Sequence, residues 1–186
     1  MDLLQGRALA QQNLWAPAEE LILLAKKGLP RDPRPLNALA VIYAEQGKLE
    51  QSVAAFAEAS RYAPDDPEIL NNLGFVQLAL GQCTEASTHL QAAISLDGTQ
   101  IEYRNNLAFA HICANELDTA MALFRSTSSE AEARYNVGVG YELQNNREVA
   151  IEQYTLALKD NPHHLLAKDA LLRLSQPATA PRSTEE

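Results

Sequence analysis

The side chains of this 186-residue chain that are best suited to catalysis or metal binding are four histidines and two cysteines. They are His89, His111, His163, His164, Cys83 and Cys113. No histidine has a serine, cysteine or carboxylate that the sequence places as its partner, and His163 and His164 fall at an expected hydrated helix start. CxxC spacing, a glycine-rich phosphate loop and an HExxH motif are all missing. The sequence therefore predicts no enzyme, no metal and no cofactor.

Asparagines form a second set of polar side chains with regular spacing, because the fragments NNLGF, NNLAF and YNVGV align with one another. An amide both donates and accepts hydrogen bonds, so it can pair with a peptide backbone of any sequence. Apolar residues one turn further on offer shallow pockets between the amides. The candidate binding residues are Asn37, Asn71, Asn72, Phe75, Asn105, Asn106, Phe109, Tyr135, Asn136 and Val139. Alternatively, the amides bond within the chain and stabilise helix packing.

These fragments belong to a longer repeat, in which a small residue is followed four positions later by a large apolar one. The pairs, spaced by 34, 34, 34 and 30 residues, are Ala18–Ile22, Ser52–Phe56, Ala86–Leu90, Ala120–Phe124 and Ala150–Tyr154. In one repeat, Leu36, Leu39, Ala40 and Tyr43 have the spacing of a helical stripe, and Gly47 ends that helix. A second striped helix follows. Two short helices cannot bury their stripes alone, so we expect successive repeats to stack.

The pattern of a large residue, x-x-Leu-Gly-x-x-Tyr, Ala-x-x-x-Phe-x-x-Ala and proline resembles the tetratricopeptide repeat (TPR) over about residues 2–163. The resemblance implies an all-α fold, a right-handed TPR superhelix (α-solenoid) of about five helix-turn-helix repeats with a C-terminal capping helix. In the array at 1–175, we expect repeats at about 1–32, 33–66, 67–100, 101–130 and 131–163, a capping helix at 163–175, and a disordered tail at 176–186.

Two parts of the array depart from the regular pattern. The fourth repeat lacks four residues between Phe124 and Val137, which is close to one helical turn, or about 6 Å. A functional notch in the array and a neutral deletion both remain open. The stripe expected to bury the capping helix comprises Leu165, Leu166, Leu171 and Leu174.

The TPR resemblance also implies where a ligand binds. The first helix of each repeat lines a concave groove in TPR superhelices, and asparagine ladders hold extended peptides in some of these grooves. Chaperone-tail TPR domains bind a terminal carboxylate with paired lysine and asparagine, whereas the groove-side candidates here include Glu45, Glu68 and Glu102. Alternatively, Glu68 and Glu102 are structural, because acidic residues in the first turn of a helix are favoured by its dipole. We therefore expect a protein or extended-peptide partner that is neutral or basic, rather than an acidic C-terminal tail.

Charge and hydropathy exclude two classes of protein. Fifteen basic residues against 24 acidic ones give a net charge of −9, and a helical-repeat RNA reader would need a basic groove. We therefore expect no nucleic-acid partner. A transmembrane segment is not expected either, because the sequence has no apolar run of about 18 residues.

The segment SEAEARYNVGVGYELQNNREVAIEQYTLALKDNP, after the shortened repeat, is also similar to the TadD-like TPR lipoproteins of bacterial tight-adherence (Flp) pilus assembly. That resemblance implies a non-catalytic assembly factor of a pilus or secretion system, with an outer-membrane secretin as a partner. It implies a periplasmic, outer-membrane-anchored protein if the chain is the mature fragment of a lipoprotein. The alternative is a cytoplasmic TPR secretion chaperone, complete as written, that binds an unfolded client.

The TPR resemblance bears on the cysteines as well. In a TPR stack, the helix ends that carry Cys83 and Cys113 are neighbours, so a disulfide is geometrically possible. We expect two buried or half-buried free thiols instead.

Overall fold

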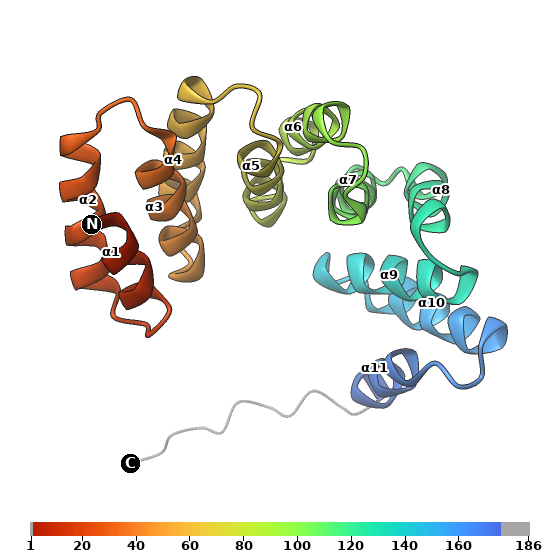
Figure 1. The fold of residues 1–186 in the computed structure, drawn as a ribbon. Helices are drawn as coiled ribbons and strands as arrows, with labels where there is room; N and C mark the ends of the chain where they lie inside the picture. The colour runs from red at the N-terminus through yellow and green to blue at the C-terminus, as the bar shows by residue number, and fades with distance from the viewer. Residues whose placement is uncertain (1, 176–186) are drawn as a thin grey trace, which may run out of the picture. The chain divides into compact units, whose positions relative to one another are not determined.

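The computed structural model describes residues 2–175, over which the chain forms eleven α-helices and no strand (Figure 1). The helices are α1 (Asp2–Ala10), α2 (Trp15–Gly28), α3 (Pro33–Glu45), α4 (Leu49–Tyr62), α5 (Pro67–Ala79), α6 (Cys83–Leu96), α7 (Ile101–Cys113), α8 (Leu117–Thr127), α9 (Glu130–Leu143), α10 (Arg147–Asp160) and α11 (Leu165–Ser175). The predicted all-α class is confirmed, while the tail expected at 176–186 lies outside the described residues. None of these helices combines the length and apolar character needed to cross a bilayer.

A left-handed residue ends the first helix of each repeat and begins the turn to the second. These residues have φ between 59° and 72° and are Asn13, Gly47, Gly81, Asn115 and Asn145. Glycine and asparagine enter this backbone region more readily than other residues do. The turn predicted at Gly47 is therefore confirmed, and it lets α4 pack back along α3.

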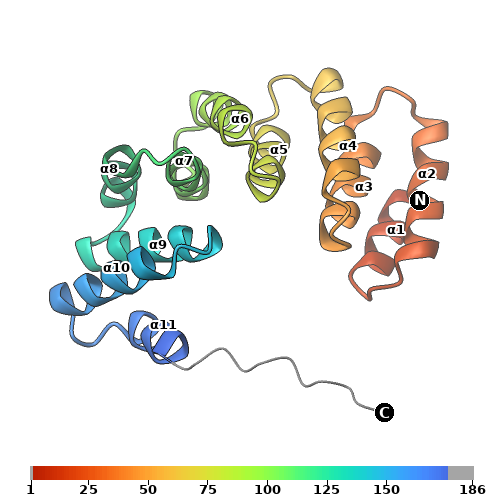
Figure 2. The same cartoon turned by 180° about the vertical axis from the view of Figure 1, so that it is seen from behind.

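The chain divides into two compact units, described here as residues 2–114 and 115–175. In the first unit, α1 packs on α2, α3 on α4 and α5 on α6, and α7 contacts both α5 and α6. From behind, α5 and α7 lie on the same side of α6 (Figure 2). In the second unit, α9 forms a hairpin with α10, α8 contacts α9 and α11 contacts α10.

Small residues allow the two helices of a hairpin to approach closely. Ser52 is buried, and its hydroxyl donates a hydrogen bond to the Ala40 carbonyl at 2.7 Å. A Cβ atom added at Gly74 would lie 2.6 Å from Leu90, and one at Gly138 would lie 2.5 Å from the Tyr154 ring. The recurring small residues therefore make room for the large residue of the second helix.

The fourth repeat loses length in both its helix and its loop. Helix α8 has 11 residues, whereas α4 and α6 have 14 each. Two residues join α8 to α9, whereas four join α4 to α5. Ser129 caps α9 by accepting a hydrogen bond from the Glu132 backbone N–H at 3.3 Å. The cap lets the next helix begin almost at once after the shortened one, and the notch stays a hypothesis.

Helix α11 packs with a face that overlaps only in part with the one predicted: Leu174 is buried and Leu171 half-buried, as expected. Its buried residues are Ala167, Ala170 and Leu174. Leu165 and Leu166, which we expected in the packed stripe, are 76% and 55% exposed, so that part of the prediction is wrong. The alanines face the neighbouring helix because their small side chains permit a closer approach than leucines would.

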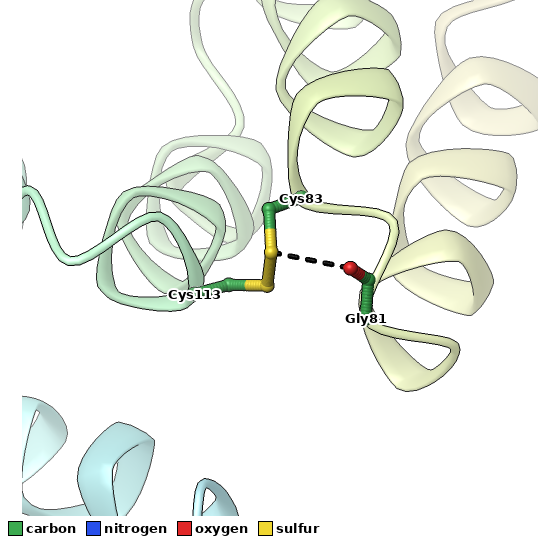
Figure 3. Close-up of a disulfide and its surroundings, with 3 residues drawn as sticks. All are labelled: Gly81, Cys83 and Cys113. Carbon is green, nitrogen blue, oxygen red and sulfur yellow. Dashed lines mark hydrogen bonds between the residues drawn. A yellow bond between two sulfur atoms is a disulfide. The ribbon is translucent and has the colours of Figure 1, made fainter.

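Cys83 and Cys113 form a disulfide, so the prediction of two free thiols is wrong (Figure 3). Cys83 is the first residue of α6 and Cys113 is the last residue of α7. Packing of α7 against α6 brings these two ends together, with the Cα atoms 5.6 Å apart, a normal separation for a disulfide. Cys83 Sγ also lies 3.3 Å from the Gly81 carbonyl oxygen.

Candidate peptide-binding site

The structure joins two of the predicted asparagines to each other. Asn71 on α5 is 2% exposed and Asn106 on α7 is 8% exposed. The Asn106 side-chain N–H donates to Asn71 Oδ1 at 2.9 Å, and Asn71 Nδ2 donates to Asn72 Oδ1 at 3.3 Å. Asn71 and Asn106 thus make the internal hydrogen bonds considered as the alternative above. Their role in ligand binding remains a prediction.

The other predicted residues vary in exposure and fall in both units. Phe75 is 57% exposed on α5. Partial burial is shared by Asn37, Asn72, Asn105, Phe109, Tyr135, Asn136 and Val139. In the second unit, the Tyr135 ring lies 5.6 Å from that of Tyr154 and 5.0 Å from that of His164, as measured between centroids. Tyr135 therefore belongs to an aromatic cluster.

A cavity of about 510 Å³ opens in the first unit, lined by residues of α1, α3 and α5 and by the start of α2. This volume is within the usual range for ligand sites, roughly 300–1,000 Å³. Its lining includes Arg7, Trp15, Asn37, Glu45 and Glu68. Of the ten predicted binding residues, Asn37 is the one that lines this cavity. We call it the N-terminal cavity.

Sequence reasoning did not select Arg7 and Trp15 as binding residues, although the repeat register contains a signal for Arg7. Arg7 lies 34 residues before Val41, which also lines the cavity, and Val41 lies 34 residues before Phe75. An arginine thus stands at a position that is otherwise apolar in these first helices. No comparable pattern marks Trp15, which begins α2 directly after the turn.

The amide of Asn37 differs from that of its counterpart Asn71. Asn37 Oδ1 is buried and has no hydrogen-bond partner within residues 2–175. The residue that corresponds to Asn106 one repeat earlier is Asn72, and its side-chain N–H groups do not donate to Asn37 Oδ1. An unsatisfied buried carbonyl costs about 1–3 kcal/mol, so a hydrogen-bond donor placed at Asn37 would be favourable.

The N-terminal cavity is lined by two arginines and two glutamates, and one of the arginines, Arg34, is held in an internal ion pair. Arg34 Nε donates to both carboxylate oxygens of Asp32, at 2.9 and 3.0 Å. The side-chain hydrogen bond from Arg34 lowers the pKa of Asp32, and Asp32 also caps α3. Neither Glu45 nor Glu68 makes an ion pair within the described part of the chain. Two carboxylates therefore remain available at the cavity.

His164 in the second unit is structural and buried, contrary to the hydrated environment expected for it. Its Nδ1 accepts a hydrogen bond from the Ala167 backbone N–H at 3.2 Å, at the start of α11. Its Nε2 lies 2.9 Å from a carboxylate oxygen of Glu132. Across residues 2–175, no three His, Cys, Asp or Glu side chains cluster in a way that could hold a metal ion.

Helical hairpins with a regular repeat define a helical-repeat protein. Residues 40–81 match the family model of the TPR repeat. Curated protein sequences provide no match to the chain. The fold is that of TPR proteins, as the residue pattern predicted, and the family-model match is confined to one 42-residue stretch of the chain.

Three solved structures illustrate this similarity of fold. YrrB, described as a TPR protein with an unusual peptide-binding site, is 24% identical, with 91% of this chain and 89% of that chain covered and a TM-score of 0.70. MamA is 19% identical, with coverages of 84% and 94% and a TM-score of 0.68. A thermophilic TPR protein of Thermus thermophilus, TTC0263, is 19% identical, with coverages of 93% and 96% and a TM-score of 0.63.

Proposed function

We propose that this chain is a non-catalytic protein–protein interaction scaffold that binds an extended peptide segment of a partner along its first helices. The observation that carries the proposal is the N-terminal cavity, where the Asn37 carbonyl is buried without a partner. The amide suits a peptide because it can pair with backbone N–H groups of any sequence. The peptide-binding site named for YrrB adds a precedent in a similar fold.

Selection of random 12-residue peptides on phage against the immobilised full chain tests this proposal. We expect the selection to enrich peptides that bind the chain in solution. Asn37→Ala should lower their affinity by about five- to tenfold, which corresponds to a loss of about 1 kcal/mol or slightly more. Gln51→Ala is the matched control, because it removes an exposed amide from α4, a second helix. If no peptide is enriched, or if both variants bind equally well, the proposal fails.

We further propose that the partner belongs to a bacterial pilus or secretion system, with an outer-membrane secretin as the candidate. The similarity of residues 129–162 to TadD-like pilus-assembly proteins supports this. The Cys83–Cys113 disulfide favours an oxidising compartment such as the periplasm over the cytoplasm of the alternative secretion chaperone. The predicted neutral or basic character of the ligand remains part of this proposal.

Cell fractionation combined with thiol labelling separates the two locations. We expect the chain in the periplasmic or outer-membrane fraction, with Cys83 and Cys113 resistant to alkylation until a reductant is added. In-cell crosslinking should then capture the secretin. Recovery in the cytoplasm with both thiols alkylated would favour the chaperone.

A further inference from the structure

We propose that the N-terminal cavity binds a lysine or arginine side chain of the partner peptide. This inference rests on the proposed function and names the chemistry of its site. Three independent features carry it: two carboxylates without ion pairs, a carbonyl without a hydrogen-bond donor, and an apolar wall beside them.

The carboxylates are supplied by opposite ends of two helices. Glu45 is the last residue of α3 and Glu68 is the second residue of α5, and both line the cavity. Asp32 compensates the charge of Arg34, whose Nε donates hydrogen bonds to both carboxylate oxygens of Asp32. The first 114 residues contain 13 acidic and 8 basic side chains, so the surrounding unit also attracts a cation.

Asn37, like the two carboxylates, requires a hydrogen-bond donor. Its Oδ1 is an acceptor, and the terminal χ2 torsion of asparagine is broad, so a rotation can turn the carbonyl toward the cavity. Lysine and arginine carry only donors at their ends. A cationic side chain in this cavity can therefore pair with the carbonyl or with a carboxylate, whereas an acidic side chain can pair with neither.

The apolar wall matches the stem of such a side chain. Trp15, Val41 and Ile42 line the same cavity. Lysine and arginine bury their methylene groups against apolar surface while the charged end stays with polar groups, and a cation over a tryptophan face is further stabilised.

The positive charge of Arg7 repels a cationic ligand, so removing that charge should change the affinity in the opposite direction from removing a carboxylate. Arg7 lines the cavity and makes no ion pair among the residues that the structure describes. Replacing Arg7 by glutamine removes a positive charge without adding bulk. A site for a cation should become tighter, whereas a site for an acidic peptide should become weaker.

The experiment uses the full chain and peptides enriched in the phage selection. Each peptide is synthesised with its lysine or arginine kept, replaced by glutamine, or replaced by glutamate, and its affinity is measured by fluorescence anisotropy. We expect enrichment of lysine or arginine at one position, a loss of about two- to fivefold with glutamine, and a larger loss with glutamate.

Variants of the chain then locate the contact. Glu45→Gln and Glu68→Gln together should lower the affinity for the basic peptide by about two- to fivefold or more. Arg7→Gln should raise that affinity. Glu50→Gln is the matched control, because Glu50 lies on α4, a second helix, and does not line the cavity. Thermal unfolding verifies that each variant is folded.

The possible outcomes separate the two proposals. If no peptide binds, the proposed function fails and this inference fails with it. If peptides bind without a preference for lysine or arginine, or if the Glu45 and Glu68 variants match the Glu50 control, the inference is overturned while peptide binding stands.

Discussion

Asn37 and Asn71 occupy equivalent positions 34 residues apart, yet their amides have different surroundings. Asn71 Oδ1 accepts a hydrogen bond from Asn106 on the next first helix, whereas Asn37 Oδ1 accepts none from Asn72, the residue that corresponds to Asn106. The residue pattern is identical at both positions. It could therefore predict the series of asparagines, but not which asparagine lacks a hydrogen-bond partner.

Gly138 illustrates a packing requirement at the scale of one methyl group. Tyr154 is buried, and its hydroxyl donates to Glu142 at 2.9 Å, so the ring cannot move freely away from a new Cβ only 2.5 Å distant. We expect Gly138→Ala to lower the free energy of unfolding by about 1–3 kcal/mol, as overpacking does.

Thermal and urea unfolding measure this effect, with Gly28→Ala as the control. A Cβ at Gly28, in the last position of α2, meets no atom within 4 Å, so that variant should be neutral or slightly stabilised. Equal stabilities of the two variants would show that the close approach is not required.

Glu142 makes the stability of the second unit depend on pH. Hydrogen bonds from the Arg173 guanidinium, together with one from Tyr154, hold the pKa of Glu142 below its usual value of 4.5. A carboxyl group with a lowered pKa contributes stability above its unfolded-state pKa and loses it as the pH falls through the folded-state pKa. We therefore expect wild type to have a higher melting temperature than Glu142→Gln at pH 7. The difference in melting temperature should disappear as the pH falls below about 4.5.

Differential scanning calorimetry from pH 7 to pH 3 tests this dependence. Glu152→Gln, an exposed carboxylate on α10, is the control and should change little at either pH. A gap between wild type and Glu142→Gln that stays constant with pH would contradict the assignment.

Helix α11 depends on a single side chain for its start. His164 accepts a hydrogen bond from the Ala167 backbone N–H, a role that Asp32 and Asp66 have at α3 and α5. We expect His164→Ala to destabilise α11 by about 1 kcal/mol, because the first turn loses its cap. His164→Asn should recover part of the loss, since its amide oxygen can accept the same hydrogen bond.

Amide hydrogen exchange over residues 165–175 is the appropriate measurement for this prediction. Faster exchange in His164→Ala than in His164→Asn is expected. The same protection in both variants would mean that burial of the imidazole, rather than capping, stabilises the start of α11.

The α6–α7 junction carries a covalent link that the residue pattern did not settle. The repeat predicted that the two helix ends are neighbours, but whether the thiols oxidise also depends on the compartment, which repeat periodicity does not encode. The link closes a segment with a sequence separation of 30, for which chain-entropy arguments give roughly 3–4 kcal/mol.

Reduction should therefore lower the stability of the first unit by up to about that amount. Chemical unfolding with and without tris(2-carboxyethyl)phosphine measures the loss. A Cys83→Ala, Cys113→Ala double variant is the control, because the reductant should leave it unchanged. If reduction does not affect the wild-type chain, the disulfide contributes nothing to stability.

At the scale of the molecule, the repeat made the fold of each compact unit predictable because hairpins pack on their neighbours in the sequence. Gly47 takes the left-handed turn conformation that the repeat predicted. The site was less predictable, because Arg7 departs from the repeat pattern and no pattern marks Trp15, and both line the N-terminal cavity. Leu165 and Leu166 failed as predicted packing residues because two alanines offered a closer contact.

The net charge of −9 should raise the association rate of a basic peptide. We expect the association rate of a lysine-containing peptide to fall at least about fivefold between roughly 50 mM and 500 mM NaCl, because salt screens long-range attraction. Stopped-flow fluorescence gives this rate. The glutamine version of the same peptide should show a weaker dependence, and equal salt dependence would argue against electrostatic attraction.

The Cys83–Cys113 bond also limits how far the chain can be stretched. In a tensile experiment that pulls on both termini, the segment between these residues cannot contribute to the contour length while the bond is intact. A separation of 30 residues corresponds to about 100 Å of extended polypeptide. The oxidised chain should therefore reach full extension about 100 Å sooner than the reduced one, because tension bypasses the segment through its two sulfur atoms.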